Sequence, residues 1–230
     1  MVGQVKHIFF DLDRTLWDFD TNAKATIEAL YNEYLAIHHF SFGDFFQTYQ
    51  LVNQQLWADY NAKKINKEHL RSHRFLNTLE KFEIHHPELA RHLEHEYIES
   101  TPNRTQLIEG TIDALDYLQE KYLLHIITNG FDEVQHRKIT HSGLSTYFKH
   151  VITSDKFKIN KPDPAIFFHA LELTQAQASE SVMIGDDLNN DILPAIEIGM
   201  HAIWLTDDIQ KKMGNEFLSI THLNQLRNLL

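Results

Sequence analysis

The fold is decided by the stretch Val5-Lys6-His7-Ile8-Phe9-Phe10-Asp11-Leu12-Asp13-Arg14-Thr15, which joins a short apolar run to two closely spaced carboxylates. An uninterrupted apolar run of this kind predicts a strand buried on both faces, as in a parallel sheet. Ligands of open parallel α/β sheets bind just beyond the carboxyl ends of the strands. Asp11 and Asp13 therefore stand where such a fold carries its chemistry. For this motif alone, a polar turn with two exposed aspartates is the simpler alternative.

The bulk composition is that of a globular chain without a basic surface. Of the 230 residues, 43% are hydrophobic and 23% are charged, an ordinary balance for a chain that buries a full core. The formal net charge of −11 argues against a general nucleic-acid binder. Small phosphate substrates stay open, because a metal ion and one or two cations can recruit them locally.

Cysteine is absent, which excludes disulfides and thiolate chemistry. The sequence shows no signal-peptide pattern and no apolar run near the roughly 18 residues that a membrane span needs. We therefore expect a cytoplasmic protein that binds neither membranes nor nucleic acid. The 16 histidines are scattered and lack the spacing of a histidine metal site.

A long helical block follows the first strand, without any strand pattern. Apolar residues recur at helical spacing over 27–35, and again over 42–56, 70–79 and 89–97. We predict that residues 17–100 form an all-helical domain inserted into the chain directly after the first strand.

Strands alternate with helices beyond residue 100. Apolar runs predict strands at 123–128, 151–153, 182–184 and 202–205, with helical patterns between them at 111–118, 133–142, 165–173 and 192–198. Strands separated by helices of this length form βαβ units with right-handed crossovers. The sequence therefore predicts an α/β fold, whose parallel-sheet core domain consists of residues 1–16 and 101–230.

Polar residues follow three of these strands at the point where each ends. The residues are Asp11 and Asp13, then Thr128, Asn129 and Gly130, then Asp186, Asp187 and Asp191, with Lys161 just before a predicted helix. Adjacent parallel strands bring such ends together, and so many carboxylates cluster only around a cation. Hard oxygen ligands favour Mg²⁺, and magnesium beside a lysine is a receptor for a phosphoryl group. One carboxylate can then act as nucleophile and a neighbour as acid and base.

The motifs DxDxT, a threonine ending the second strand, the lysine of KPDP, and GDDxxxD occur in this order along the chain. Over its whole length the chain resembles the haloacid dehalogenase superfamily of phosphohydrolases. The resemblance implies a Rossmann-like core and identifies the helical insertion as a cap domain. It implies Asp11 as nucleophile and Asp13 as general acid and then general base. Thr128 and Lys161 would bind the phosphoryl oxygens.

The resemblance also implies a Mg²⁺ site. Its ligands would be the Asp11 carboxylate, the backbone carbonyl of Asp13 and the Asp186 carboxylate. Lys161 would offset the charge between Asp11 and Asp186. Arg14 stands where many relatives have glycine, and we assign it no role.

Less follows for the neighbouring residues. Asn129 is expected near the phosphate or the leaving group. Of Asp187 and Asp191, one would contact metal-bound water or Lys161 and the other would cap a helix; the sequence leaves open which. An acid at Asp13 indicates phosphate chemistry rather than dehalogenation, because a halide leaves without a proton and an alkoxide does not.

The cap stretch from Tyr49 to Phe75, with TLWDFD and ITNGF, resembles the noncanonical pyrimidine nucleotide phosphatases of this superfamily. This implies a 5′-nucleotidase acting on pyrimidine nucleoside monophosphates. We expect the base to contact Phe19, Asn53, Trp57 or Tyr60, since aromatic faces stack on bases and amides read their edges. The alternative is that these side chains are cap core.

Other functions stay open at this stage. One is a sugar-phosphate phosphatase or phosphomutase with the same core, and another is a hydrolase of broad specificity that repairs metabolites. A phosphate-binding regulator without turnover is disfavoured, because Asp11 and Asp13 are both present. The sequence predicts neither the physiological substrate nor the oligomeric state.

Overall fold

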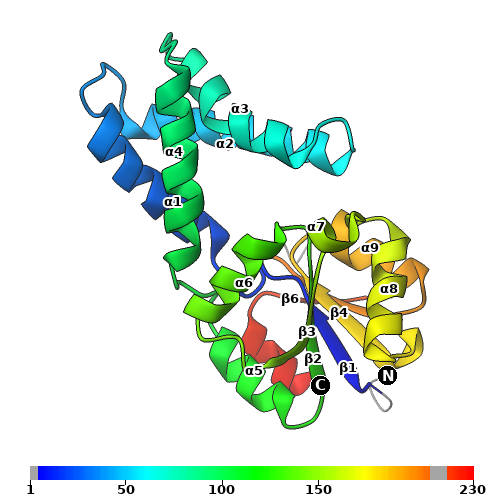
Figure 1. Cartoon of the computed structure of the whole chain (residues 1–230). Coiled ribbons are helices and arrows are strands. Elements are labelled where there is room, and N and C mark those ends of the chain that lie inside the picture. The colour runs from blue at the N-terminus through cyan, green and yellow to red at the C-terminus, as the bar shows by residue number, and fades with distance from the viewer. Residues whose placement is uncertain (1–4, 208–216) are drawn as a thin grey trace. The chain divides into compact units, whose positions relative to one another are not determined.

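The computed structural model describes residues 5–207 and 217–230. The chain divides into two compact units: a sheet unit of Met1–Phe19 with Thr105–Leu230, and a helical unit of Asp20–Arg104. Each change of unit falls a few residues beyond the predicted limits at 16 and 100, and the predicted core domain includes residues 1–4 and 208–216, which lie outside the described residues. The predicted combination of a parallel α/β core with an inserted helical domain is confirmed (Figure 1).

The sheet unit is built on six parallel strands in the order β3-β2-β1-β4-β5-β6. The strands are β1 (His7–Phe10), β2 (Leu123–Thr128), β3 (Phe148–Thr153), β4 (Ser181–Gly185), β5 (His201–Leu205) and β6 (Leu218–Ile220). β1 lies between β2 and β4, with Phe10 in register with Ile126 and Ile184. The loops after these three central strands therefore leave the same edge of the sheet side by side.

Helices cover both faces of this sheet. They are α5 (Thr111–Gln119), α6 (Asp132–His141), α7 (Ser154–Phe157), α8 (Pro164–Thr174) and α9 (Leu193–Glu197). Ile8 and Phe10 pack with α5 and α6 on one face, whereas Phe9 packs with α8 and α9 on the other. The apolar run at β1 is continuous because both faces are buried. Within the described ranges, no helix has the length and apolarity needed to cross a bilayer.

Three histidines lie close together on the neighbouring strands β1, β2 and β3. His7 on β1 and His125 on β2 face each other, with Nδ1 and Nε2 3.2 Å apart, and the ring of His150 on β3 lies 5.5 Å from that of His125. Burial lowers the pKa of His125 to about 3, helped by its two histidine neighbours. Burial also lowers the pKa of His7, against the attraction of Glu180.

Two short elements were not predicted from the sequence. β6 has three residues and α7 has four, too few to show a periodic pattern. The predicted start of α8 holds in detail, since Asp163 caps the helix by accepting from the Ala165 amide at 3.0 Å, with Pro164 following.

The helical unit has its own core. Its helices are α1 (Phe19–Leu30), which begins in the sheet unit, α2 (Phe42–Asn61), α3 (Lys67–Glu80) and α4 (Pro87–Ser100), with a π-helical turn at Tyr31–Leu35 and a 3₁₀ turn at Thr101–Asn103. Aromatic side chains such as Phe45, Tyr49 and Phe75 fill the space between them. A buried ion pair joins Arg74 of α3 to Glu94 of α4 at 3.5 Å.

Candidate active site

The loop after β1 fixes the first two carboxylates. The Asp11 amide donates to the Ile184 carbonyl at 2.9 Å, which extends the pairing of β1 with β4 to the last residue before the loop turns. Leu12, Leu16 and Trp17 are fully buried and anchor the loop in the core. Arg14 has a φ of 65°, in the left-handed region that favours glycine.

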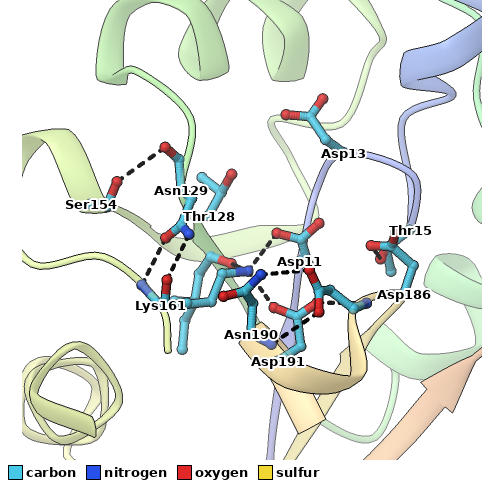
Figure 2. A network of polar contacts seen from close by, with 12 residues as sticks. Asp11, Asp13, Thr15, Thr128, Asn129, Ser154, Lys161, Asp186, Asn190 and Asp191 are labelled. Atoms are coloured by element: carbon cyan, nitrogen blue, oxygen red, sulfur yellow. Dashed lines mark hydrogen bonds and ion pairs between the residues drawn. The ribbon is translucent and has the colours of Figure 1, made fainter. Parts of the chain in front are cut away.

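Lys161 is the centre of the site. Its Nζ donates to Asp11 Oδ1 and to Asp191 Oδ1, both at 2.6 Å, and to the Ile127 carbonyl at 2.9 Å (Figure 2). The Lys161 side chain is 2% exposed and that of Asp191 is 1% exposed. All three protons of the ammonium therefore have acceptors. The carboxylates hydrogen-bonded to Lys161 are Asp11 and Asp191, and Asp191 is one of the two aspartates that the sequence offered as its contact. The charge of Lys161 also opposes the rise in the pKa of Asp186.

Burial dominates the electrostatics of this group. It raises the pKa of Asp11 well above its usual value; Lys161 opposes the shift, and Asp191 and Asp186 add to it. Burial likewise raises the pKa of Asp191, against the pull of Lys161. Burial and the nearby Asp191 raise the pKa of Asp186 to about 7. Burial alone would lower the pKa of Lys161, but the two carboxylates outweigh it and leave it raised.

Three carboxylates and one ammonium leave an excess of negative charge in a buried place. Asp11, Asp186 and Asp191 each offer an oxygen, and these oxygens lie within 4.8 Å of one another. Hard carboxylate oxygens at this spacing suit a divalent cation such as Mg²⁺, which would neutralise the excess charge. The donor set therefore fits the metal that the sequence predicts.

Asp13 lies apart from the Lys161 group and has other partners (Figure 2). Lys138 Nζ of α6 donates to Asp13 Oδ1 at 2.6 Å, and Gln135 Nε2 of the same helix donates to Asp13 Oδ2 at 2.9 Å. Gln135 Nε2 also donates to Thr128 Oγ1 at 2.7 Å. The two residues expected to serve as acid and phosphate ligand, Asp13 and Thr128, are thus joined through one amide.

The side chain of Asn129 binds the backbone of Lys161. Asn129 Nδ2 donates to the Lys161 carbonyl at 2.9 Å, and Asn129 Oδ1 accepts from the Lys161 backbone amide at 2.8 Å. Ser154 Oγ of α7 donates to the Asn129 carbonyl at 3.1 Å. The Asn129 side chain, which the sequence places near the phosphate or the leaving group, therefore fixes the segment that carries Lys161.

The choice that the sequence left open between Asp187 and Asp191 has a structural answer. Asp191 contacts Lys161, whereas Asp187 caps the following turn by accepting from the amides of Asn189 and Asn190. Asp186 is held from both sides: Thr15 Oγ1 donates to its carboxylate at 3.3 Å, and Trp204 Nε1 donates to its carbonyl at 2.8 Å.

Two glycines make room for these contacts. A Cβ on Gly185 would lie 2.2 Å from Asp191 Oδ2, and a Cβ on Gly130 would lie 2.3 Å from Gln135 Cδ. Atoms cannot approach so closely, so only glycine leaves Asp191 and Gln135 in place.

The residues expected to contact the base divide between the two units. Phe19 is half-buried in the sheet unit, where its ring lies 4.6 Å from the Arg14 guanidinium carbon and 5.5 Å from Lys138 Nζ. Trp57 of the helical unit is half-buried and packs edge-on against Tyr60. Asn53 of the same unit is buried, and its Oδ1 has no hydrogen-bond partner among the described residues.

Sequence reasoning missed Gln135 and Lys138. Polar residues at i and i+3 of a helix are usually solvent-exposed, so nothing in their spacing marked them. The glycine at position 130, two residues after the threonine that ends β2, was the available signal, because it implies a side chain packed tightly over that turn.

An acidic group and a buried lysine at the carboxyl edge of a parallel sheet, with a helical insertion after the first strand, define an α/β enzyme. The chain belongs to the haloacid dehalogenase-like hydrolases, whose family model matches residues 5–199.

Several relatives align along most of the chain. Pyrimidine 5′-nucleotidase YjjG of Escherichia coli is 31% identical over 199 residues, which cover 86% of this chain and 84% of YjjG. Pyrimidine 5′-nucleotidase PynA of Streptococcus pneumoniae is 31% identical over 202 residues, covering 86% and 83%. A glyceraldehyde 3-phosphate phosphatase of Pyrococcus furiosus is 28% identical over 249 aligned positions, covering 99% and 93%.

A crystal structure shares the same architecture. The putative HAD-hydrolase YfnB of Bacillus subtilis, solved bound to magnesium, superposes with a TM-score of 0.87 at 26% identity, covering 99% of each chain.

Proposed function

We propose that this protein is a Mg²⁺-dependent phosphatase that hydrolyses phosphate monoesters through an aspartyl-phosphate on Asp11, and that its substrates are pyrimidine nucleoside 5′-monophosphates. One observation carries the chemistry. Asp11 directly follows the central strand β1 and its Oδ1 accepts from Lys161, while Asp13, two residues further on, accepts from side chains of α6. The two carboxylates thus stand in different environments, as two different roles require.

Each role follows from the surroundings of the side chain. The Asp11 carboxylate attacks phosphorus, and Lys161 keeps its orientation. Asp13 gives its proton to the leaving oxygen and later takes one from the attacking water. Thr128, already bonded to Gln135 and to the Gly130 amide, presents its hydroxyl to a phosphoryl oxygen.

The acidic group would hold the metal. Its proposed ligands are the carboxylates of Asp11 and Asp186 and the backbone carbonyl of Asp13. Asp191, bonded to Lys161, would complete the surroundings of the site. When bound, Mg²⁺ supplies positive charge against the phosphoryl oxygens.

The substrate class is supported by the relatives and by the helical unit. YjjG and PynA are both named pyrimidine 5′-nucleotidases. In the helical unit, Asn53 carries a buried oxygen that has no partner within the described part of the chain, and a buried acceptor of this kind costs free energy unless something donates to it. A base edge offers such a donor, and Trp57, one helical turn further along α2, offers a stacking face.

A second candidate is a phosphatase of small sugar or triose phosphates. It is favoured by the Pyrococcus furiosus relative, which aligns along almost the whole chain. The residues of the sheet unit serve both candidates equally, so substrate preference has to decide between them.

The deciding experiment measures phosphate release with Mg²⁺ from dUMP, dTMP, UMP, AMP, glucose 6-phosphate and glyceraldehyde 3-phosphate. We expect kcat/KM for the pyrimidine monophosphates to exceed that for the other esters by at least about 10-fold, the discrimination that one pocket contact provides. Preference for glyceraldehyde 3-phosphate would favour the second candidate and leave the chemistry of Asp11 standing.

A matched pair of variants then tests the base contact. Asn53→Leu removes the buried amide, and Gln54→Leu changes an exposed amide on the same helix. We expect Asn53→Leu to lower the pyrimidine preference and Gln54→Leu to leave it unchanged. Equal preference in both variants would remove Asn53 from the specificity site.

A further inference from the structure

Helix α6 carries two polar side chains that are unusually deeply buried. Gln135 is 0% exposed and Lys138 is 4% exposed. A lysine on a surface helix ordinarily reaches solvent with its ammonium and buries only its stem. Burying the ammonium costs free energy unless an anion compensates it, and here the anion is the carboxylate of Asp13.

Both oxygens of that carboxylate are held from α6. Oδ1 accepts from Lys138 Nζ at 2.6 Å and Oδ2 accepts from Gln135 Nε2 at 2.9 Å. Two donors on one rigid helix restrict the rotation of the carboxyl group about its bond to the chain. Asp13 is therefore held in one orientation, although it lies on a loop.

Burial of the Gln135 side chain costs free energy, which suggests that its hydrogen bonds have a specific role. Its amide nitrogen serves Asp13 and Thr128, but its Oε1 is buried without a hydrogen-bond partner among the described residues. An amide with an unsatisfied oxygen is a poor choice for a core position. What Gln135 contributes is therefore the pair of hydrogen bonds from its Nε2 to Asp13 and Thr128, for which Gly130 leaves room.

Two aromatic rings lie close to the ammonium of Lys138. Nζ lies 4.4 Å from the centre of the Trp17 ring and 5.5 Å from that of Phe19. Ring faces at these distances attract a cation and exclude water from it. Lys138 is thereby fixed in place against the loop that carries Asp13.

We propose that Gln135 and Lys138 are positioning residues for the Asp13 carboxyl, aligning it for proton transfer to the leaving oxygen. The proposal rests on the proposed phosphatase function. In the first step an Asp11 oxygen forms a bond to phosphorus, the ester P–O bond breaks, and its electron pair goes to the leaving oxygen, which takes the proton of Asp13. In the second step the oxygen of water bonds to phosphorus, Asp13 takes the water proton, and the bond to Asp11 breaks.

This role predicts a dependence on the leaving group. An alkoxide, such as the 5′-oxygen of a nucleoside, needs the proton of Asp13 to depart. A p-nitrophenolate departs without it. Because kcat/KM reports steps only up to departure of the leaving group, misalignment of Asp13 lowers kcat/KM for the nucleotide and largely spares the aryl ester.

The experiment compares kcat/KM for dUMP and for p-nitrophenyl phosphate in wild type, Lys138→Met and Gln135→Met. For Lys138→Met we expect a loss of about 100-fold with dUMP, the lower end of what general acid catalysis contributes, and a much smaller loss with the aryl ester. Gln135→Met should show the same pattern with a smaller loss, and Lys138→Arg should recover part of the dUMP activity. Lys121→Met, which changes an exposed lysine beside Tyr117, serves as the control and should match wild type with both esters.

Each contrary outcome is distinct. Equal losses with both esters would mean that Lys138 and Gln135 support the fold and would overturn the positioning role. So would unchanged activity with dUMP in both variants. A wild-type protein that hydrolyses neither ester would instead overturn the proposed function, and the positioning role with it.

Discussion

Lys161 and Lys138 are both buried lysines near the carboxyl ends of the central strands, yet their ammonium groups have different surroundings. Lys161 lies between Asp11 and Asp191 with Asp186 close by, so carboxylates outnumber it. Lys138 donates to the carboxylate of Asp13 and has aromatic rings close to its ammonium. The first group has excess negative charge and the second is balanced. The difference indicates that the first is built to receive a cation and the second to hold a carboxyl group still.

The largest expected effect comes from removing the nucleophile of the first group. Asp11→Asn should lower kcat at least about 1,000-fold, since loss of the attacking group removes the whole pathway. Phosphate release measures this, and circular dichroism should show an unchanged fold. Asp163→Asn, which keeps an acceptor at the start of α8, is the control and should stay active. Substantial turnover in pure Asp11→Asn would contradict the mechanism.

Metal binding should distinguish the two groups next. Chelation by EDTA should abolish activity, and excess Mg²⁺ should restore it and raise Tm, because a ligand of the folded state stabilises it. Asp186→Asn should lose the rise in Tm. Asp13→Asn should keep the rise while losing turnover, since only its backbone carbonyl is a proposed ligand. Loss of the rise in Asp13→Asn alone would reverse the assignment of the two groups.

Removing either lysine should lower the free energy of unfolding, an effect smaller than the loss of activity in Asp11→Asn. Lys161→Met leaves buried carboxylates without their cation, which typically costs about 3–5 kcal/mol. Lys138→Met leaves the Asp13 side chain, which is 23% exposed and can be hydrated, so a cost of about 1–3 kcal/mol is expected. Urea unfolding followed by fluorescence measures both. A greater loss in Lys138→Met would contradict the idea that the Lys161 group is the more charged and more deeply buried.

His125 provides a third case of a buried titratable side chain, because its neighbours are the histidines His7 and His150 rather than carboxylates. The pKa of His125 is about 3 in the folded protein, against about 6.5 in an unfolded chain. The unfolded state therefore binds more protons below pH 6.5, and stability falls as pH drops from there toward 3, by up to about 1.4 kcal/mol per pH unit. Above pH 6.5 this contribution is constant.

Thermal unfolding across pH 4 to 8 tests this expectation. His125→Phe, which can still stack on Phe9, should have a shallower decline of Tm below pH 6.5 than wild type. His95→Phe changes an exposed histidine of the helical unit and should keep the wild-type decline. Identical declines in all three proteins would assign the acid sensitivity to other groups.

The sequence predicted those helices and strands that local patterns of apolar and capping residues indicate. The apolar run before Asp11, the alternation beyond residue 100 and the Asp163-Pro164 helix start each correspond to an observed element. The cluster of strand-end residues followed from topology, because parallel strands carry their ends to one edge. The three-residue strand β6 had no pattern to detect.

The partners of the site residues could not be predicted in the same way. The sequence offered Asp187 and Asp191 as contacts of Lys161 without deciding between them. That Lys138 and Gln135 turn inward to Asp13 depends on how α6 packs on the sheet. Such packing is a tertiary property, and a buried lysine has the same letter as an exposed one. The contributions of Phe19, Asn53 and Trp57 to specificity remain predictions for the substrate panel and its variants.

The two glycines at the ends of β2 and β4 set a limit for anyone who would engineer this enzyme. Even a methyl group at either position would meet the side chain of Gln135 or Asp191. If positions 130 and 185 are randomised in a directed-evolution library, the active members should therefore carry glycine at both positions. Altered specificity has to be sought elsewhere, for instance at positions 53 and 57 on α2, which belong to the helical unit.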